Sequence, residues 1–163
     1  MDALKHSFPP VADARTRLLV LGSLPGEESL ARRQYYGNPR NHFWRLMETV
    51  LDRPLVGLGY EERLEALLGA GVGLWDTVGA ATRRGSLDGS IRLSRANDLS
   101  ALAASLPELR AVGFNGGKSA AIGTRQLEAH PRLALVPLPS SSPAFTLPFE
   151  EKAERWRALR SWL

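Results

Sequence analysis

Four short runs of apolar residues predict buried β-strands in this chain. None of these runs alternates cleanly between apolar and polar positions, which is typical of a parallel sheet covered by helices on both faces. The predicted strands span 17–21, 71–75, 109–114 and 133–137.

Between the strands, apolar residues recur at helical spacing. The clearest stripe follows Asn38 and Pro39, a capping residue and a proline suited to the first helical position. Its apolar members lie at i, i+3, i+4, i+7 and i+8, namely Phe43, Leu46, Met47, Val50 and Leu51. Further helices are predicted over 61–68, 98–106, 118–128 and 149–163, and the longest expected loop is 79–96.

The order of these elements is β-α-α-β-α-β-α-β-α. It predicts an α/β fold, with a single domain over 1–163 and a three-layer α/β/α arrangement around a central four-stranded parallel sheet. Polar or glycine-rich residues follow every predicted strand, and such strand ends meet at one edge of a parallel sheet. The segments are GSLPG at 22–26, Asp76 with Thr77, NGGK at 115–118 and PSSSP at 139–143. A ligand site is expected there.

Composition narrows the chemistry that this site could perform. With 163 residues, of which 44% are hydrophobic and 23% charged, the chain resembles an ordinary globular protein. The absence of cysteine excludes disulfides, cysteine nucleophiles and cysteine-ligated zinc or iron–sulfur sites. The three histidines lack metal-ligand spacing, so no metal is expected. Without an apolar run of membrane length or a signal segment, a cytoplasmic protein is expected.

The charge balance leaves two interpretations open. The formal net charge is +4 and the sequence pI is about 10.0. Arginines occur in pairs at Arg32–Arg33 and Arg83–Arg84, and arginine suits bidentate contacts with phosphate. Nucleic-acid binding and a solvated basic surface explain this charge equally well.

Two widespread motifs are incompletely matched. The segment GFNGGKS at 113–119 has three residues between its first glycine and Gly-Lys, where a nucleotide-binding P-loop has four. The segment GSLPG places Ser23 one position too early for the G-x-S-x-G elbow of serine hydrolases. Both classes are therefore disfavoured.

Considered together, the segments resemble the uracil-DNA glycosylase superfamily, and within it the hypoxanthine-DNA (deoxyinosine) glycosylase branch. The matching segments are GSLPGEESL at 22–30, QYYGNPRNHFW at 34–44, GLWDTV at 73–78, GSLD at 85–88, FNG at 114–116 and LPSSSPA at 138–144. The resemblance implies a uracil-DNA glycosylase-like fold. It also implies an enzyme that extrudes hypoxanthine, or a related deaminated base such as uracil or xanthine, from DNA. Such an enzyme hydrolyses the N-glycosidic bond without a cofactor and leaves an abasic site.

The resemblance further assigns roles in a base pocket. The expected pocket residues are Ser23, Leu24, Tyr36, Gly37, Asp76 and Asn115. Tyr36 is expected to stack on the base and Asp76 to accept an N–H from its edge, whereas Tyr35 is expected to pack in the protein. Leu24 stands where the classical uracil enzymes carry a water-holding Asp or Asn, so the catalytic role is expected to fall to Asn41.

Each of these roles has a structural alternative. Tyr36 could pack beneath its loop, Asp76 could cap a turn, and Asn41 could satisfy the backbone in the first turn of its helix. For Asn115, a turn-forming role before Gly-Gly is the favoured alternative.

DNA carrying deaminated bases is the expected partner, bound by a monomer. The residues expected to hold the phosphates are Ser140, Ser141, Ser142, Arg83 and Arg84, with Arg92 and Arg95 near the same loop. The candidates to fill the gap left in the duplex are Ala144, Phe145 and Leu147. No lysine is expected in the site, which predicts a monofunctional enzyme. The alternatives are a non-catalytic nucleic-acid-binding domain, which Leu24 supports, and a small-molecule hydrolase.

Overall fold

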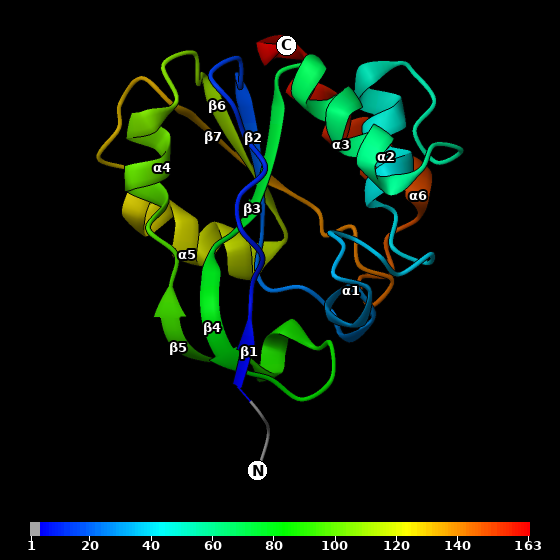
Figure 1. Ribbon diagram of the computed structural model, residues 1–163, viewed down its shortest axis with the longest axis vertical. Coiled ribbons are helices and arrows are strands. Elements are labelled where there is room, and N and C mark those ends of the chain that lie inside the picture. Colours follow the sequence, from blue (N-terminus) through cyan, green and yellow to red (C-terminus); the bar gives the residue numbers. More distant parts are fainter. Residues whose placement is uncertain (1–3) are drawn as a thin grey trace.

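A computed structural model describes residues 4–163, apart from the side chains of Leu93 and Ser94. Its centre is a parallel sheet with the strand order β3-β2-β6-β7 (Figure 1). The strands are β2 (Leu18–Gly22), β3 (Val72–Asp76), β6 (Ala111–Asn115) and β7 (Ala134–Leu138). All neighbouring pairs are parallel. The four strands predicted from apolar runs are confirmed, with ends shifted by one or two residues.

Helices cover both faces of this sheet, which confirms the three-layer α/β/α prediction. On one face lie α4 (Leu99–Ser105) and α5 (Gly117–Leu127). On the other lie α2 (Phe43–Leu51), α3 (Tyr60–Gly69) and α6 (Phe149–Trp156), which continues into the 3₁₀ helix η2 (Arg157–Trp162) (Figure 1). The predicted helices are confirmed, and a short helix, α1 (Glu27–Arg32), adds to them.

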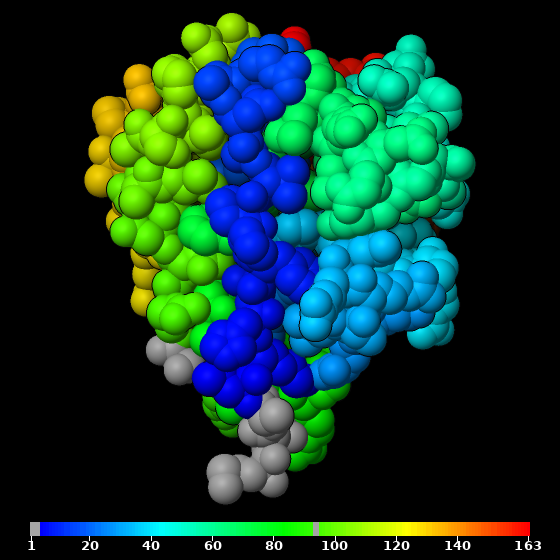
Figure 2. Space-filling view, viewed as in Figure 1, coloured from blue at the N-terminus to red at the C-terminus, as the bar shows by residue number. Residues whose placement is uncertain are grey.

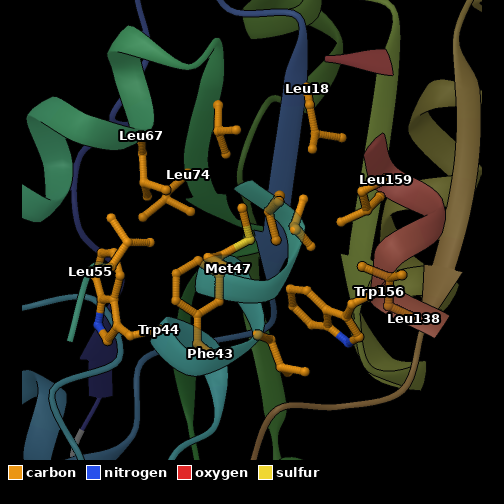
Figure 3. Packing of buried hydrophobic residues seen from close by; sticks show 14 of the residues in the cluster. Leu18, Phe43, Trp44, Met47, Leu55, Leu67, Leu74, Leu138, Trp156 and Leu159 are labelled. Carbon is orange, nitrogen blue, oxygen red and sulfur yellow. The ribbon is translucent and has the colours of Figure 1, made fainter. Parts of the chain in front are cut away.

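The larger part of the core lies between α2 and the sheet. Phe43 and Met47 of α2 are fully buried and pack in the cluster that includes Leu18, Leu74 and Trp156 (Figure 3). This face of α2 carries the apolar stripe recognised in the sequence. The position of α2 matters for the site, because its first turn faces the carboxyl ends of the strands.

A second sheet was not predicted. It is antiparallel with the order β1-β4-β5, and consists of β1 (Leu4–His6), β4 (Val78–Thr82) and β5 (Arg92–Ala96). The connection from β4 to β5 contains the 3₁₀ helix η1 (Asp88–Ser90). The prediction that 79–96 is a loop is therefore wrong for much of its length. Small residues dominate β4, and β5 itself contains Arg92 and Arg95, so neither strand shows the apolar run of a buried strand.

The N-terminal segment connects the two sheets. Val11 and Leu74 exchange two backbone hydrogen bonds of 2.8 Å, and the Ser7 amide donates to the Gly79 carbonyl at 3.1 Å. A Cβ at Gly73 would lie 2.8 Å from the Val11 carbonyl oxygen, so this close approach requires glycine. Figure 2 shows the segment running along one side of the molecule between the two helical layers. No helix in the described part of the chain is long and apolar enough to cross a membrane.

Candidate active site

A cavity of about 540 Å³ lies at the carboxyl ends of the parallel strands. The loops after β2, β6 and β7 line it, together with the end of β3, the segment before α2 and the turn before η1. Nine of the twelve residues predicted for the site are among its lining residues, namely Ser23, Leu24, Tyr36, Asn41, Asp76, Asn115, Ser140, Ser141 and Ser142. The convergence of the strand ends, inferred from the topology, therefore brings these side chains together.

Asp76, the last residue of β3, supplies a buried carboxylate. Its exposed fraction is 3%, and its Oδ2 has no hydrogen-bond partner among the described residues. A Cβ at Gly22 would lie 2.6 Å from Asp76 Oδ1 and 3.0 Å from the Tyr36 hydroxyl, so glycine makes room for both groups. Burial, reinforced by the negative charge of Asp88, raises the pKa of Asp76 to about 7, against the opposing effect of Arg83. The carboxyl group can therefore change charge near neutral pH.

Tyr36 forms a rigid aromatic surface beside this carboxylate. Its ring stacks on Phe43 with a centroid separation of 3.9 Å and an interplanar angle of 12°. Its backbone adopts φ 55°, a left-handed conformation that is unusual for an aromatic residue and often marks a functional site. Burial and the nearby Asp76 raise the pKa of the Tyr36 hydroxyl, so the phenol stays neutral.

Neighbouring residues fasten the loop that carries Tyr36. Tyr35 is buried, and its hydroxyl donates to the Pro9 carbonyl at 2.9 Å, in agreement with a packing role. The Gly37 amide donates to Ser29 Oγ at 2.9 Å. Gly37 lies outside the large cavity and lines a second one, of about 300 Å³, whose wall also includes Asn41.

Asn115 lines the cavity, but its amide is engaged within the protein. Its Oδ1 accepts from the Ser141 amide at 2.8 Å, and its Nδ2 donates to Ser141 Oγ at 2.9 Å and to the Tyr36 hydroxyl at 3.2 Å. This side chain holds the loop after β7 against the Tyr36 ring. Asn115 was expected either to contact the base with a free amide or to shape the turn before Gly-Gly. The structure agrees with neither role, because the Asn115 side chain connects two other loops.

Asn41 stands immediately before α2. The helix begins at Phe43, so the prediction that Asn38 and Pro39 start it is wrong. Instead, Asn41 Oδ1 accepts from the Phe43 amide at 2.9 Å, while its NH₂ group makes no hydrogen bond with the described residues. The expected catalytic role and its structural alternative therefore use different atoms of one side chain.

The three serines after β7 differ in their surroundings. Ser141 is buried and bound to Asn115 as described, whereas Ser140 and Ser142 are less enclosed. Ser140 Oγ accepts from the Ser142 amide, and Ser142 Oγ accepts from the Ala144 amide, both at 3.1 Å. Each of these two hydroxyls can still donate its hydrogen, which suits a phosphate oxygen.

Leu24 contributes packing. It is buried in a small cluster with Val78, Ala81 and Ile91. Its side chain can neither hold a water nor accept a proton, as expected from the sequence.

Arg83 differs from the expectation that it contacts DNA, whereas for the exposed Arg84 this contact stays a prediction. The Arg83 side chain is fully buried, and it donates from Nη1 to the Leu24 carbonyl at 3.0 Å and from Nε to the Gly85 carbonyl at 2.9 Å. Burial lowers the pKa of this guanidinium, but nearby carboxylates favour its charged form. Arg84 is exposed but lines neither cavity. Their adjacency in the sequence could not show that only Arg83 is buried, because its burial depends on the turn that folds over its side chain.

Four charged residues that line the cavity had no predicted role, namely Glu28, Arg40, Asp88 and Lys118. Asp88 lies in the turn before β5, and burial raises its pKa, although Ser23, Arg83 and Lys118 lower it. Lys118, at the start of α5, also lines the cavity, contrary to the expectation that no lysine is near the site. The segment GSLD at 85–88 was the available signal for Asp88, but two of the residues that act on its carboxylate, Ser23 and Lys118, are distant from it in the sequence.

Three residues were predicted to fill the gap that the extruded base leaves in the duplex. Ala144 and Phe145 line the cavity and Leu147 does not.

The disfavoured alternatives find no support in the geometry. Ser119, which a P-loop would direct at a magnesium ion, is buried and donates to the Leu21 carbonyl at 2.6 Å. Ser23 has no histidine partner among the described residues, and the His42 ring packs edge-on against Phe149. A P-loop and a serine–histidine pair are thus both disfavoured.

Fold and site together define an α/β protein with a polar and aromatic cavity at its strand ends. The family model of the uracil DNA glycosylase superfamily matches residues 9–160, and the chain belongs to this superfamily. Among its relatives is the hypoxanthine DNA glycosylase of Methanosarcina barkeri, 45% identical over 71% of this chain and 73% of the relative. The hypoxanthine DNA glycosylase of Methanosarcina acetivorans is 44% identical over the same shares of the two chains.

A solved structure agrees with this assignment. It is the solution NMR structure of a Methanosarcina acetivorans protein provisionally assigned as a uracil DNA glycosylase. The two structures superpose with a TM-score of 0.86 over 98% of this chain and 99% of the other, at 38% sequence identity. The uracil-DNA glycosylase-like fold expected from the sequence is confirmed.

Proposed function

We propose that this protein is a monofunctional DNA glycosylase that removes hypoxanthine from DNA, with uracil and xanthine as secondary substrates. One observation supports this most strongly: the buried Asp76 carboxylate, with a free Oδ2, lies beside the Tyr36 ring in a cavity lined by strand-end loops. The names of the two curated relatives support the choice of hypoxanthine.

Asp76 and Tyr36 would read the extruded base. Stacking on an aromatic ring contributes roughly 1–3 kcal/mol per base, independently of the sequence. An ionised Asp76 accepts the N1–H of hypoxanthine, whereas adenine presents a lone pair at N1 and is repelled. Uracil and xanthine also carry ring N–H groups, so the same carboxylate admits them.

Asn41 would assist the departure of the base. Cleavage of a glycosidic bond passes through an oxocarbenium-like state, and negative charge develops on the leaving base. With Oδ1 occupied by the Phe43 amide, Asn41 presents its NH₂ group as a donor. A donor placed at the developing charge stabilises the transition state.

Because Leu24 cannot hydrogen-bond the attacking water, another residue must position that water. Besides Asp76, the carboxylates lining the cavity are Glu28 and Asp88, and Glu28 is paired with Arg32. Asp88 is therefore the best candidate to position the water. Its oxygen lies 3.9 Å from the Arg83 guanidinium, whose positive charge opposes the rise that burial causes in the pKa of Asp88.

Hydrolysis without a covalent intermediate explains the site best. A Schiff base requires a neutral amine, which burial or a neighbouring cation favours. Lys118 is exposed and lacks that burial. Ser140 and Ser142 would bind the phosphates beside the extruded nucleotide.

The proposal is tested with labelled oligonucleotides that contain a single hypoxanthine, uracil, xanthine or mismatched thymine. After incubation in EDTA and treatment with alkali, strand breaks are expected at hypoxanthine first. An absence of breaks at every base would contradict the proposal, and binding without cleavage would favour a non-catalytic DNA-binding domain. Borohydride is expected to trap no covalent complex, and trapping at Lys118 would exclude the monofunctional mechanism.

A further inference from the structure

Two exposed apolar side chains line the cavity. Leu87 is 56% exposed and Phe145 is 45% exposed, and both line the cavity. They come from distant loops, one between β4 and η1 and the other after β7. A single exposed leucine is ordinary on a protein surface, so exposure alone assigns no role.

Several hydrogen bonds hold the turn that carries Leu87. Beneath it, the buried Arg83 guanidinium binds the Gly85 carbonyl and also the Leu24 and Pro25 carbonyls of the loop after β2. Ser90 Oγ accepts from the Arg84 amide at 2.9 Å and donates to the Leu87 carbonyl at 2.8 Å. These bonds fasten the turn to the neighbouring wall of the cavity.

Lys5 and Ser86 connect the same turn to neighbouring elements. Lys5 Nζ donates to the Arg83 carbonyl at 2.8 Å and to the Gly85 carbonyl at 3.0 Å, and it also pairs with Glu27. Ser86 Oγ accepts from the Glu27 amide at 2.8 Å. The turn is thus tied to β1 and to α1. Its leucine cannot withdraw into the protein without breaking several hydrogen bonds.

We propose that Leu87 packs into the base stack of duplex DNA next to the extruded nucleotide. Apolar side chains of this kind replace the stacking that a flipped base gives up. A side chain held on a rigid turn loses little conformational entropy on insertion. The inference rests on the proposed function, since it takes the cavity to be the base pocket.

Duplex and single-stranded substrates distinguish this role. Leu87→Ala is expected to lower kcat/KM for a hypoxanthine duplex about tenfold, equivalent to about 1.4 kcal/mol. It should leave excision from the same single strand unchanged, since no stack must be opened. Leu4→Ala is the matched control, because Leu4 is 49% exposed and lines neither cavity. An equal loss on both substrates, or no loss on either, would overturn the inference.

A fluorescence measurement separates this inference from the proposed function. In a duplex with 2-aminopurine beside an abasic site, saturating wild-type protein is expected to raise the fluorescence by unstacking the probe. Leu87→Ala should reduce this rise, and Leu87→Met should restore most of it. The absence of a rise with wild-type protein, or an undiminished rise with Leu87→Ala, would contradict a role in the stack. Failure of excision by the wild-type protein on every substrate would instead contradict the proposed function.

Discussion

Two groups of polar residues in the cavity use their polar atoms in opposite ways. In the first group, Asn115 forms hydrogen bonds through both ends of its amide, with Ser141 and with Tyr36. In the second group, Asp76 Oδ2 is buried without a hydrogen-bond partner in the described part of the chain, and the NH₂ of the half-buried Asn41 makes no hydrogen bond there either. Leaving a buried polar group such as Asp76 Oδ2 unpaired is costly, so such groups persist where a ligand completes them. The first group therefore holds the shape of the site, and the second is available for chemistry.

The largest expected effect comes from Asn41, in the second group. Asn41→Ala should lower hypoxanthine excision by about a hundredfold or more, the usual consequence of losing one transition-state hydrogen bond. Asn41→Asp keeps an oxygen that caps the Phe43 amide but lacks the NH₂ donor, and it should lose activity to the same extent. Single-turnover kinetics measure both variants. An active Asn41→Asp would show that Asn41 does not act as a donor.

Asp76 is expected to make excision depend on pH. With its pKa at about 7, the ionised fraction rises about tenfold between pH 6 and pH 8, and the single-turnover rate should follow. Asp76→Asn should flatten this profile. Asp88→Asn should lower the rate, since Asp88 is proposed to position the water, and should move the remaining inflection to lower pH, because the charge of Asp88 contributes to the raised pKa of Asp76. An inflection that survives in Asp76→Asn would have to come from another group.

The Asp76 carboxylate should make the rate of excision rise with pH, but it should make the stability of the protein fall with pH. Because folding raises the pKa of Asp76 from 3.8, the folded state binds more protons than the unfolded state between about pH 4 and pH 7. The free energy of unfolding should therefore fall as pH rises through this range, by about 1.4 kcal/mol per pH unit at most. Urea unfolding should show Asp76→Asn gaining stability over the wild type as pH rises. Parallel curves for the two proteins would contradict this.

Substitution of Asn115, in the first group, should lower the stability of the protein more than its rate of excision. Asn115→Ala leaves the buried Ser141 amide without an acceptor, which should cost about 1–3 kcal/mol in the free energy of unfolding. Its effect on the rate of excision should be smaller than that of Asn41→Ala. Urea unfolding and single-turnover kinetics on the same samples make the comparison. A hundredfold loss of rate without loss of stability would contradict the distinction between the two groups.

The smallest effect is expected at the serine loop. Ser142→Ala removes one hydroxyl donor to phosphate, worth about 0.5–1.5 kcal/mol, and should raise KM by about two- to tenfold. The control is Ser105→Ala, on the exposed end of α4. A KM equal to that of the control would place the phosphates elsewhere.

Part of this site could be predicted from the sequence because its signals are local. Apolar runs indicated the parallel strands, and the topology of such a sheet brings their ends to one edge. Asp76, Asn115 and the serines at 140–142 therefore met in the cavity as expected. Leu24 was also interpretable from its side chain alone, because no conformation allows it to hold a water.

The tertiary structure decided how each polar atom is used. Arg83 and Arg84 are adjacent in sequence, yet only Arg83 is enclosed by the turn it supports. Asn41 and Asn115 are chemically identical, yet one retains a free NH₂ and the other does not. Hydrogen bonds in a folded protein join residues far apart in the chain, so local patterns cannot assign them. The sequence by itself determined which groups reach the strand ends, and the packing of distant loops decided which remain available for DNA.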